Sequence, residues 1–162
     1  MLPTTNLLPM RLVIAGDHSS PALKQALVEH LQRGGHTVRD LGTCAEASVD
    51  YPDFAEAACA EVLAGRADRA VLICGTGIGI AISANKIPGI RCGVAHNAFT
   101  GALASEHNHA QVLAIGARVL DAPTAIATVD AWLTTARSDG PRHLRRIEKI
   151  TALEQRACNP KA

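Results

Sequence analysis

The stretch from Ala70 to Ile80 most constrains the fold, because an apolar run there ends on Cys74 and gives way to three alternating glycines. Aliphatic residues followed by glycines are typical of a buried parallel strand that runs into a tight turn. Residues 80–86 then follow a helical pattern, which places the glycines at a helix N-terminus. Backbone N–H groups at such an end attract an anion or a developing oxyanion, and they would stabilise a Cys74 thiolate, the reactive form of cysteine.

The glycine spacing itself fits no common nucleotide motif. A dinucleotide fingerprint needs its third glycine three residues after the second, where this chain has Ile80, and the stretch lacks the Gly-Lys-Ser/Thr ending of a P-loop. A cysteine in a buried strand is also often only a small apolar core residue. The local pattern therefore leaves Cys74 open as a reactive thiol or a core side chain.

The rest of the chain alternates apolar runs with helical patterns. Strands are expected over residues 11–18, 36–41, 70–74, 90–96 and 112–116. Helices are expected between and after them, over residues 22–33, 53–64, 80–86, 97–106 and 123–135. This alternation implies right-handed crossovers and predicts an α/β, Rossmann-like three-layer sandwich, in which a five-stranded parallel sheet carries helices on both faces.

An extra C-terminal helix is expected over residues 142–158, with no strand after it. It carries an apolar stripe of Leu144, Ile147, Ile150 and Leu153. The stripe would either cover a partner subunit or pack back on its own domain.

The length of 162 residues suits one domain, expected over residues 10–158 between a flexible extension at 1–9 and a tail at 159–162. Only 2% of the residues are aromatic, so the core must be built mainly from aliphatic side chains. A formal net charge of +1 gives no broad basic surface, which disfavours nucleic acid as a partner. No apolar run approaches the roughly 18 residues that a membrane span needs.

The five cysteines are odd in number and form no C-x-x-C pair. This argues against a disulfide framework and a zinc site, and we expect a reducing, cytoplasmic setting. His107 and His109 are two residues apart, a spacing that does not share a helix face, so no metal site is expected there.

Candidate functional side chains gather where the predicted strands end, the place where such folds bind ligands. They are Asp17 and His18, Cys74 with its glycines, His107 and Asn108, and Arg118. Arg142 and Arg146 share a helix face and could grip a phosphate, or they could form a solvated surface. Asp17 could equally be a turn or cap residue, and Tyr51, placed in the loop before Pro52, could be a packing anchor.

Taken together, these features resemble the ribose-5-phosphate isomerase B and galactose-6-phosphate isomerase family. The similarity runs in register from Met10 to about Gln155. It is carried by Ala15-Gly-Asp-His18, Asp50-Tyr-Pro52, Ile73-Cys-Gly-Thr-Gly-Ile-Gly79, Ala84-Asn-Lys86, Gly89-Ile-Arg91, His107-Asn108, Val112-Leu113, Gly116-Ala-Arg118 and residues 142–148.

The resemblance implies a cofactor-free, metal-free isomerase that interconverts ribose 5-phosphate and ribulose 5-phosphate through a cis-enediolate, as in the pentose phosphate pathway. Cys74 would be the base that moves the proton between C2 and C1, His107 the acid for ring opening, and Asp17 an aid at the same oxygens. The turn of Gly75, Thr76, Gly77, Ile78 and Gly79 would donate N–H groups to the enediolate. The remaining substrate contacts would come from His18, Tyr51, Asn108, Arg118, Arg142 and Arg146, with the arginines and His18 on the phosphate.

The resemblance also implies a homodimer, or a dimer of dimers, with sites between subunits, so that His107 and Arg118 would act on the other chain's Cys74. One position departs from the family pattern: His109 stands where Asp is common. This leaves allose, galactose or erythrulose phosphate as alternative substrates. A non-catalytic sugar-phosphate or nucleotide-binding module is the main alternative of another class, and a nicotinamide dehydrogenase fits less well.

Overall fold

The computed structural model describes residues 8–45 and 47–159. Most of the expected extension at 1–9 and of the tail at 159–162 lies outside these ranges. Over the described ranges, no helix combines the length and apolar character that a membrane crossing requires.

The described residues form one five-stranded parallel sheet in the order β2-β1-β3-β5-β4. Its strands are β1 (Arg11–Gly16), β2 (Thr37–Asp40), β3 (Arg69–Cys74), β4 (Cys92–Val94) and β5 (Val112–Gly116). β3 lies in the middle and is buried along its whole length. The predicted Rossmann-like sheet is therefore confirmed, with the Cys74 strand at its centre.

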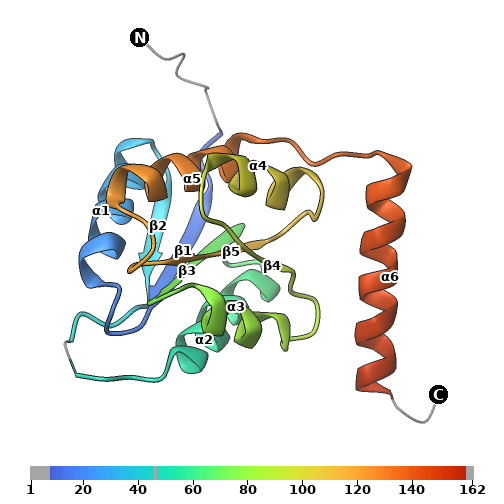
Figure 1. Cartoon of the computed structure of the whole chain (residues 1–162), viewed down its shortest axis with the longest axis horizontal. Helices are drawn as coiled ribbons and strands as arrows, with labels where there is room; N and C mark the ends of the chain where they lie inside the picture. The colour runs from blue at the N-terminus through green and yellow to red at the C-terminus, as the bar shows by residue number, and fades with distance from the viewer. Residues whose placement is uncertain (1–7, 46, 160–162) are drawn as a thin grey trace.

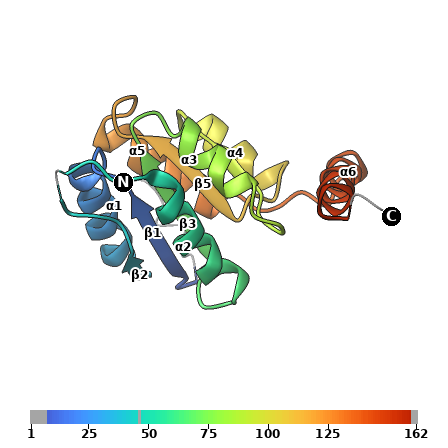
Figure 2. The same ribbon diagram turned by 90° about the horizontal axis from the view of Figure 1, so that it is seen from below.

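Helices cover both faces of the sheet, as predicted (Figures 1 and 2). One face carries α1 (Pro21–Arg33), α4 (Ala98–Glu106) and α5 (Ala122–Thr134), and the other carries α2 (Tyr51–Leu63) and α3 (Ile78–Asn85). The side-chain alternation of a strand divides the core accordingly. Leu12 and Ile14 of β1 point into the first core, whereas Val13 and Ala15 point into the second.

Two boundaries differ from the prediction in ways that affect the site. Tyr51 begins α2 instead of lying in a loop, because Pro52 fits the first turn of a helix, where its missing N–H has no role. β4 covers three residues instead of the seven expected over 90–96. It is an edge strand, and short edge strands present few unpaired backbone groups.

The last helix, α6 (Pro141–Cys158), stands away from the rest of the chain (Figure 1). None of its described residues is buried, and Ile150 and Leu153 of the apolar stripe are 45% and 60% exposed. Near its far end, Glu154 Oε1 accepts a hydrogen bond from Gly89 N at 2.9 Å. The stripe therefore does not pack into the core of its own domain, one of the two placements expected.

Candidate active site

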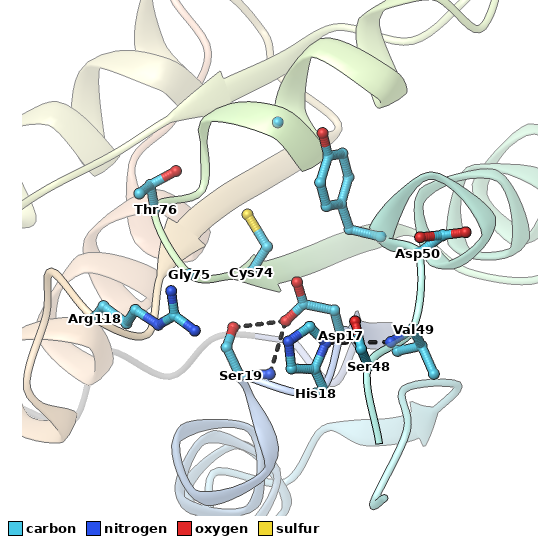
Figure 3. A pocket seen from close by; sticks show the side chains of 12 residues that line it. Asp17, His18, Ser19, Ser48, Val49, Asp50, Cys74, Gly75, Thr76 and Arg118 are labelled. Atoms are coloured by element: carbon cyan, nitrogen blue, oxygen red, sulfur yellow. Dashed lines mark hydrogen bonds between the residues drawn. The ribbon is translucent and has the colours of Figure 1, made fainter. Parts of the chain in front are cut away.

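A pocket of about 410 Å³ opens at the carboxyl ends of β1, β3 and β5, and Figure 3 shows the side chains that line it. This volume is in the range of small-molecule sites. The pocket contains eight of the predicted site residues, namely Asp17, His18, Tyr51, Cys74, Gly75, Thr76, Gly79 and Arg118. It adds Ser19, Ser48, Val49 and Asp50, to which the sequence analysis assigned no role in the site.

Cys74 has features of both a core side chain and a reactive thiol, the two alternatives that the sequence left open. Its side chain is 4% exposed and packs in the core between the sheet and α2 and α3, yet it also lines the pocket. The backbone N–H of Gly77 donates a hydrogen bond to Cys74 Sγ at 3.2 Å. A donor aimed at the sulfur stabilises a thiolate, as expected for a cysteine beside a helix N-terminus.

The turn after Cys74 depends on Gly77, the N-cap of α3. Its φ of +80° lies in the left-handed region that favours glycine. A Cβ at this position would also lie 2.9 Å from the carbonyl carbon of Ile115, so a side chain does not fit. Both constraints hold the backbone of the turn against β5, in the conformation in which the N–H of Gly77 donates to Cys74 Sγ.

A second glycine of this turn, Gly79, gives Tyr51 its place. A Cβ on Gly79 would lie 2.6 Å from Tyr51 Cζ, so the phenol ring rests directly on the first turn of α3. Tyr51 is thus a packing residue between α2 and α3, and it also presents its ring to the pocket. The two interpretations of Tyr51 from the sequence are compatible.

Asp17 and His18 follow β1 into the same pocket. Asp17 is 5% exposed, and its Oδ1 accepts hydrogen bonds from Ser19 Oγ at 2.6 Å and from Ser19 N at 2.9 Å. Asp17 therefore holds the turn before α1 as well as lining the pocket. His18 Nδ1 accepts a hydrogen bond from Val49 N at 3.3 Å, which leaves Nε2 to carry the proton of a neutral ring.

Arg118 lies in the pocket of its own chain, so the expectation that it acts on another chain's Cys74 is wrong. The reason is the strand order, because β5 pairs directly with β3 and places Gly116 opposite Cys74. Arg118 N also donates to Gly75 O at 2.9 Å. Its guanidinium lies beside the glycine turn and gives the pocket a fixed positive charge (Figure 3).

The other predicted residues do not join this pocket. Its lining, as far as the chain is described, includes none of His107, Asn108, Arg142 and Arg146. They lie instead where α4 ends and α6 begins. There the His107 ring stacks on the ring of His143, with the ring centroids 4.1 Å apart and the planes at 15°. The chain thus carries its predicted site residues in two separate groups.

The pKa values of three groups outside the pocket are shifted, those of His143, Cys59 and Cys92. Partial burial, and then the positive charges of His107, Arg142 and Arg146, lower the pKa of His143, while Glu106 opposes them. Burial raises the pKa of Cys59 to about 11 and that of Cys92 further still. Cys59 and Cys92 therefore remain protonated, unreactive thiols at neutral pH.

No three His, Cys, Asp or Glu side chains of the described chain lie close enough together to hold a metal ion.

The extra lining residues Ser48, Val49 and Asp50 come from the segment between β2 and α2, which has no periodic pattern. In the sequence, Asp50 belongs to the Asp50-Tyr-Pro52 segment of the family resemblance, whereas Ser48 and Val49 had no signal beyond their position just before it.

Three comparisons bear on this site. A family model described as Ribose/Galactose Isomerase matches residues 12–150. Ribose-5-phosphate isomerase B of Escherichia coli is 44% identical over 140 residues, covering 86% of this chain and 93% of the relative. A putative sugar phosphate isomerase of Bacillus subtilis, YwlF, is 41% identical over 148 residues, covering 91% of this chain and 99% of the relative.

The solved structures to which this chain is similar include enzymes of the same kind. Ribose-5-phosphate isomerase B of Clostridium thermocellum superimposes with a TM-score of 0.87 at 42% identity, covering 91% of this chain and 99% of that one. The enzyme of Mycoplasma genitalium, solved with bound ribulose-5-phosphate, superimposes with a TM-score of 0.83 at 38% identity, covering 90% and 96%.

Proposed function

This chain belongs to the ribose/galactose isomerase family of sugar-phosphate isomerases, and from that membership we propose that it interconverts ribose 5-phosphate and ribulose 5-phosphate. The observation that carries the proposal is Cys74 Sγ, which accepts the N–H of Gly77 inside a pocket that also contains Asp17 and Arg118. A stabilised thiolate next to backbone donors and a fixed cation suits proton transfer beside the carbonyl of a phosphorylated sugar. The bound ribulose-5-phosphate of the M. genitalium relative supports the same choice of sugar.

In the proposed reaction, the Cys74 thiolate removes the proton from C2 of the open-chain aldose. The electron pair of that C–H bond forms the C1–C2 double bond, and negative charge develops on the two enediolate oxygens. The N–H groups of the turn over residues 75–79 donate to these oxygens, with Asp17 assisting at the same hydroxyl and carbonyl groups. The proton of the C2 hydroxyl passes to O1, a transfer in which Asp17 assists. The Cys74 thiol then returns its proton to C1, and an electron pair on O2 forms the C2 carbonyl of the ketose, so no cofactor is needed.

We propose that the active form is a homodimer, or a dimer of dimers, whose site combines the two groups of residues. Arg118 and His18 would hold the phosphate from the Cys74 side. His107 of the partner subunit would open the sugar ring, Asn108 would bind hydroxyl groups, and Arg142 and Arg146 would complete the phosphate grip. The separation of these residues from the pocket of their own chain supports this arrangement. The five unpaired cysteines are consistent with the cytoplasmic location that we propose.

The test is to assay the purified protein with the phosphates of four aldoses, namely ribose, allose, galactose and erythrose, and to measure the rate of ketose formation with each. The proposal expects ribose 5-phosphate to exceed the others by at least about tenfold in kcat/KM. A larger kcat/KM for another sugar phosphate would support an isomerase but would contradict ribose 5-phosphate as its substrate. If none of the sugar phosphates is turned over, the proposal is wrong, and a non-catalytic binding module becomes the better interpretation.

A further inference from the structure

The turn that ends α4, Ser105 to His109, holds the segment that leads to α6. Ser105 Oγ donates to Thr135 O at 2.8 Å, and Ser138 N donates to Glu106 O at 2.9 Å. His109 Nε2 lies 2.9 Å from Ser138 O. These three hydrogen bonds fix both ends of the short segment 135–138 to the turn that also carries His107 and Asn108.

His109 has an unusual conformation for this contact. Its φ of +48° makes it the one non-glycine residue of the described chain in the left-handed region. Asn, Asp and His are the residues that tolerate this region best. A carbonyl oxygen can only accept, so Nε2 of His109 must carry the hydrogen in this bond. The sequence therefore places here a residue that meets both demands, a left-handed backbone and a long side-chain donor.

We propose that His109 is a positioning residue that fixes the direction in which α6 leaves the domain, and with it the placement of Arg142 and Arg146. This inference rests on the proposed function, in which those arginines grip the phosphate. Because Nε2 of His109 is engaged with Ser138 O, its departure from the family pattern acts on the segment that leads to α6.

The direction of α6 needs such a restraint because the helix has little other anchorage on its own chain. None of its described residues is buried. The His143 ring near its start stacks on His107, and Glu154 near its far end accepts the hydrogen bond from Gly89 N. A small rotation at Ser138 would therefore be carried along the helix to the arginines. A bidentate grip on a phosphate depends on such geometry, whereas the thiol chemistry at Cys74 does not.

The first test is steady-state kinetics with ribose 5-phosphate on two variants. His109→Asn keeps a residue suited to the left-handed backbone but is too short to reach Ser138 O, so it removes the bond with little strain. His109→Gln retains a donor at about the distance of Nε2. We expect His109→Asn to raise KM about tenfold with kcat within about threefold, and His109→Gln to restore KM to within about threefold. An unchanged KM in His109→Asn, or an equal loss in both variants, would overturn the proposal.

The second test does not depend on activity. Trypsin cleaves after Arg137, which is exposed and precedes Ser138. We expect cleavage of the Arg137–Ser138 bond in the full-length protein to be several times faster in His109→Asn than in the wild type or His109→Gln. His96→Asn is the matched control, because the exposed His96 ring makes no hydrogen bond to the described residues, and its cleavage rate should equal that of the wild type.

The two tests separate failure of this inference from failure of the proposed function. If the wild type isomerises no sugar phosphate, the proposed function fails, while the trypsin rates still decide whether His109 holds the segment. If cleavage accelerates in His109→Asn but KM is unchanged in an active enzyme, His109 stabilises the segment without positioning the arginines, and the proposal is overturned.

Discussion

Cys74 is distinguished from the other cysteines of the chain by its surroundings, because burial alone does not separate it from Cys59. Cys59 is fully buried among aliphatic side chains, Cys92 is half-buried at the sheet edge, and Cys44 and Cys158 are exposed. Cys74 alone combines a place in the pocket with a hydrogen bond from Gly77 N. The proposed base is thus distinguished by one backbone donor and one glycine that no other residue can replace.

Replacing Cys74 by Ala should reduce kcat by at least about a thousandfold, because the proton on C2 loses its base. Inorganic phosphate should still bind to the variant, since Arg118 is unchanged. Calorimetric titration of the variant with phosphate measures this affinity. Cys59→Ala is the matched control and should retain kcat within about threefold. Near wild-type turnover in Cys74→Ala would contradict the proposed mechanism.

Thiol labelling provides a second measurement at this scale. In a Cys44→Ser/Cys158→Ser background, iodoacetamide at pH 8 should modify Cys74 and inactivate the enzyme, and ribose 5-phosphate should slow the reaction. Cys59, with its pKa raised to about 11, is protonated at this pH and should remain unmodified. Its labelling should appear only as the pH rises toward that value. Peptide mass spectrometry identifies the modified thiol, and modification of Cys59 before Cys74 would count against the assignment.

The sequence allowed Cys74, Asp17, His18 and Arg118 to be predicted as pocket residues, because each lies at or just after the end of a strand whose apolar run is easy to recognise. The roles of Ser48, Val49 and Asp50 could not be predicted, since they depend on how an irregular segment folds over the end of β1. Arg118 was expected to act on another chain's Cys74 but lines the pocket with Cys74 of its own chain, because strand order decides which strand ends are neighbours.

Among the elements, β3 joins the pocket at its carboxyl end to a buried polar cluster at its other end. Arg69 donates to Trp132 O at 2.6 Å and to Ser105 Oγ at 3.2 Å, and its guanidinium lies over the Trp132 ring at 4.8 Å. Burial, with the charge of Arg137 nearby, lowers the pKa of Arg69 to about 10, so it remains charged at neutral pH. This cluster ties the ends of α4 and α5 to the central strand.

Replacing Arg69 by Met keeps the length of the side chain but leaves two buried acceptors without their donor. We expect the free energy of unfolding to fall by about 2–6 kcal/mol, at roughly 1–3 kcal/mol for each of the two unsatisfied groups. Urea unfolding followed by Trp132 fluorescence at fixed protein concentration measures this. Arg69→Lys retains the charge and one donor and should lose less. Equal stability of all three proteins would show that the cluster contributes nothing.

The stacked rings at the start of α6 predict a dependence on pH. Because the pKa of His143 lies below its ordinary value of 6.5, the folded protein holds this ring neutral where an unfolded chain would begin to protonate it. The sign follows: the stack is undisturbed above pH 6.5 and is destabilised as the pH falls below it. An NMR titration of the His143 ring should give a midpoint below 6.5, and Glu106→Gln should lower it further. A midpoint above 6.5 would contradict the structure.

Most elements could be predicted from periodicity alone, and β5 has the bounds that were expected. The edge strand β4 was overestimated, because apolar residues 90–96 look like a full strand although only three of them find a partner in β5. The placement of α6 could not be predicted either, since the same stripe serves equally well for its own domain or for another subunit.

For the whole molecule, the two groups of site residues predict complementation between inactive subunits. Cys74→Ala and His107→Ala should each be inactive as homodimers. Mixed and re-equilibrated in equal amounts, half of the dimers are mixed and half of their sites contain both native residues, so about a quarter of wild-type activity should return. Absence of recovery, with mixed dimers demonstrated by mass, would exclude a site shared in this way.

The boundary of the folded core and the boundary of the proposed site do not coincide along the chain. The buried apolar residues of the described chain run from Leu12 to Leu133, whereas the proposed site extends to Arg146. Substitutions in α6 would therefore leave the melting temperature and cellular abundance of the domain almost untouched while abolishing catalysis. A survey of variants that scores abundance would rank these positions as tolerant, and only a survey of growth or turnover would reveal them as essential.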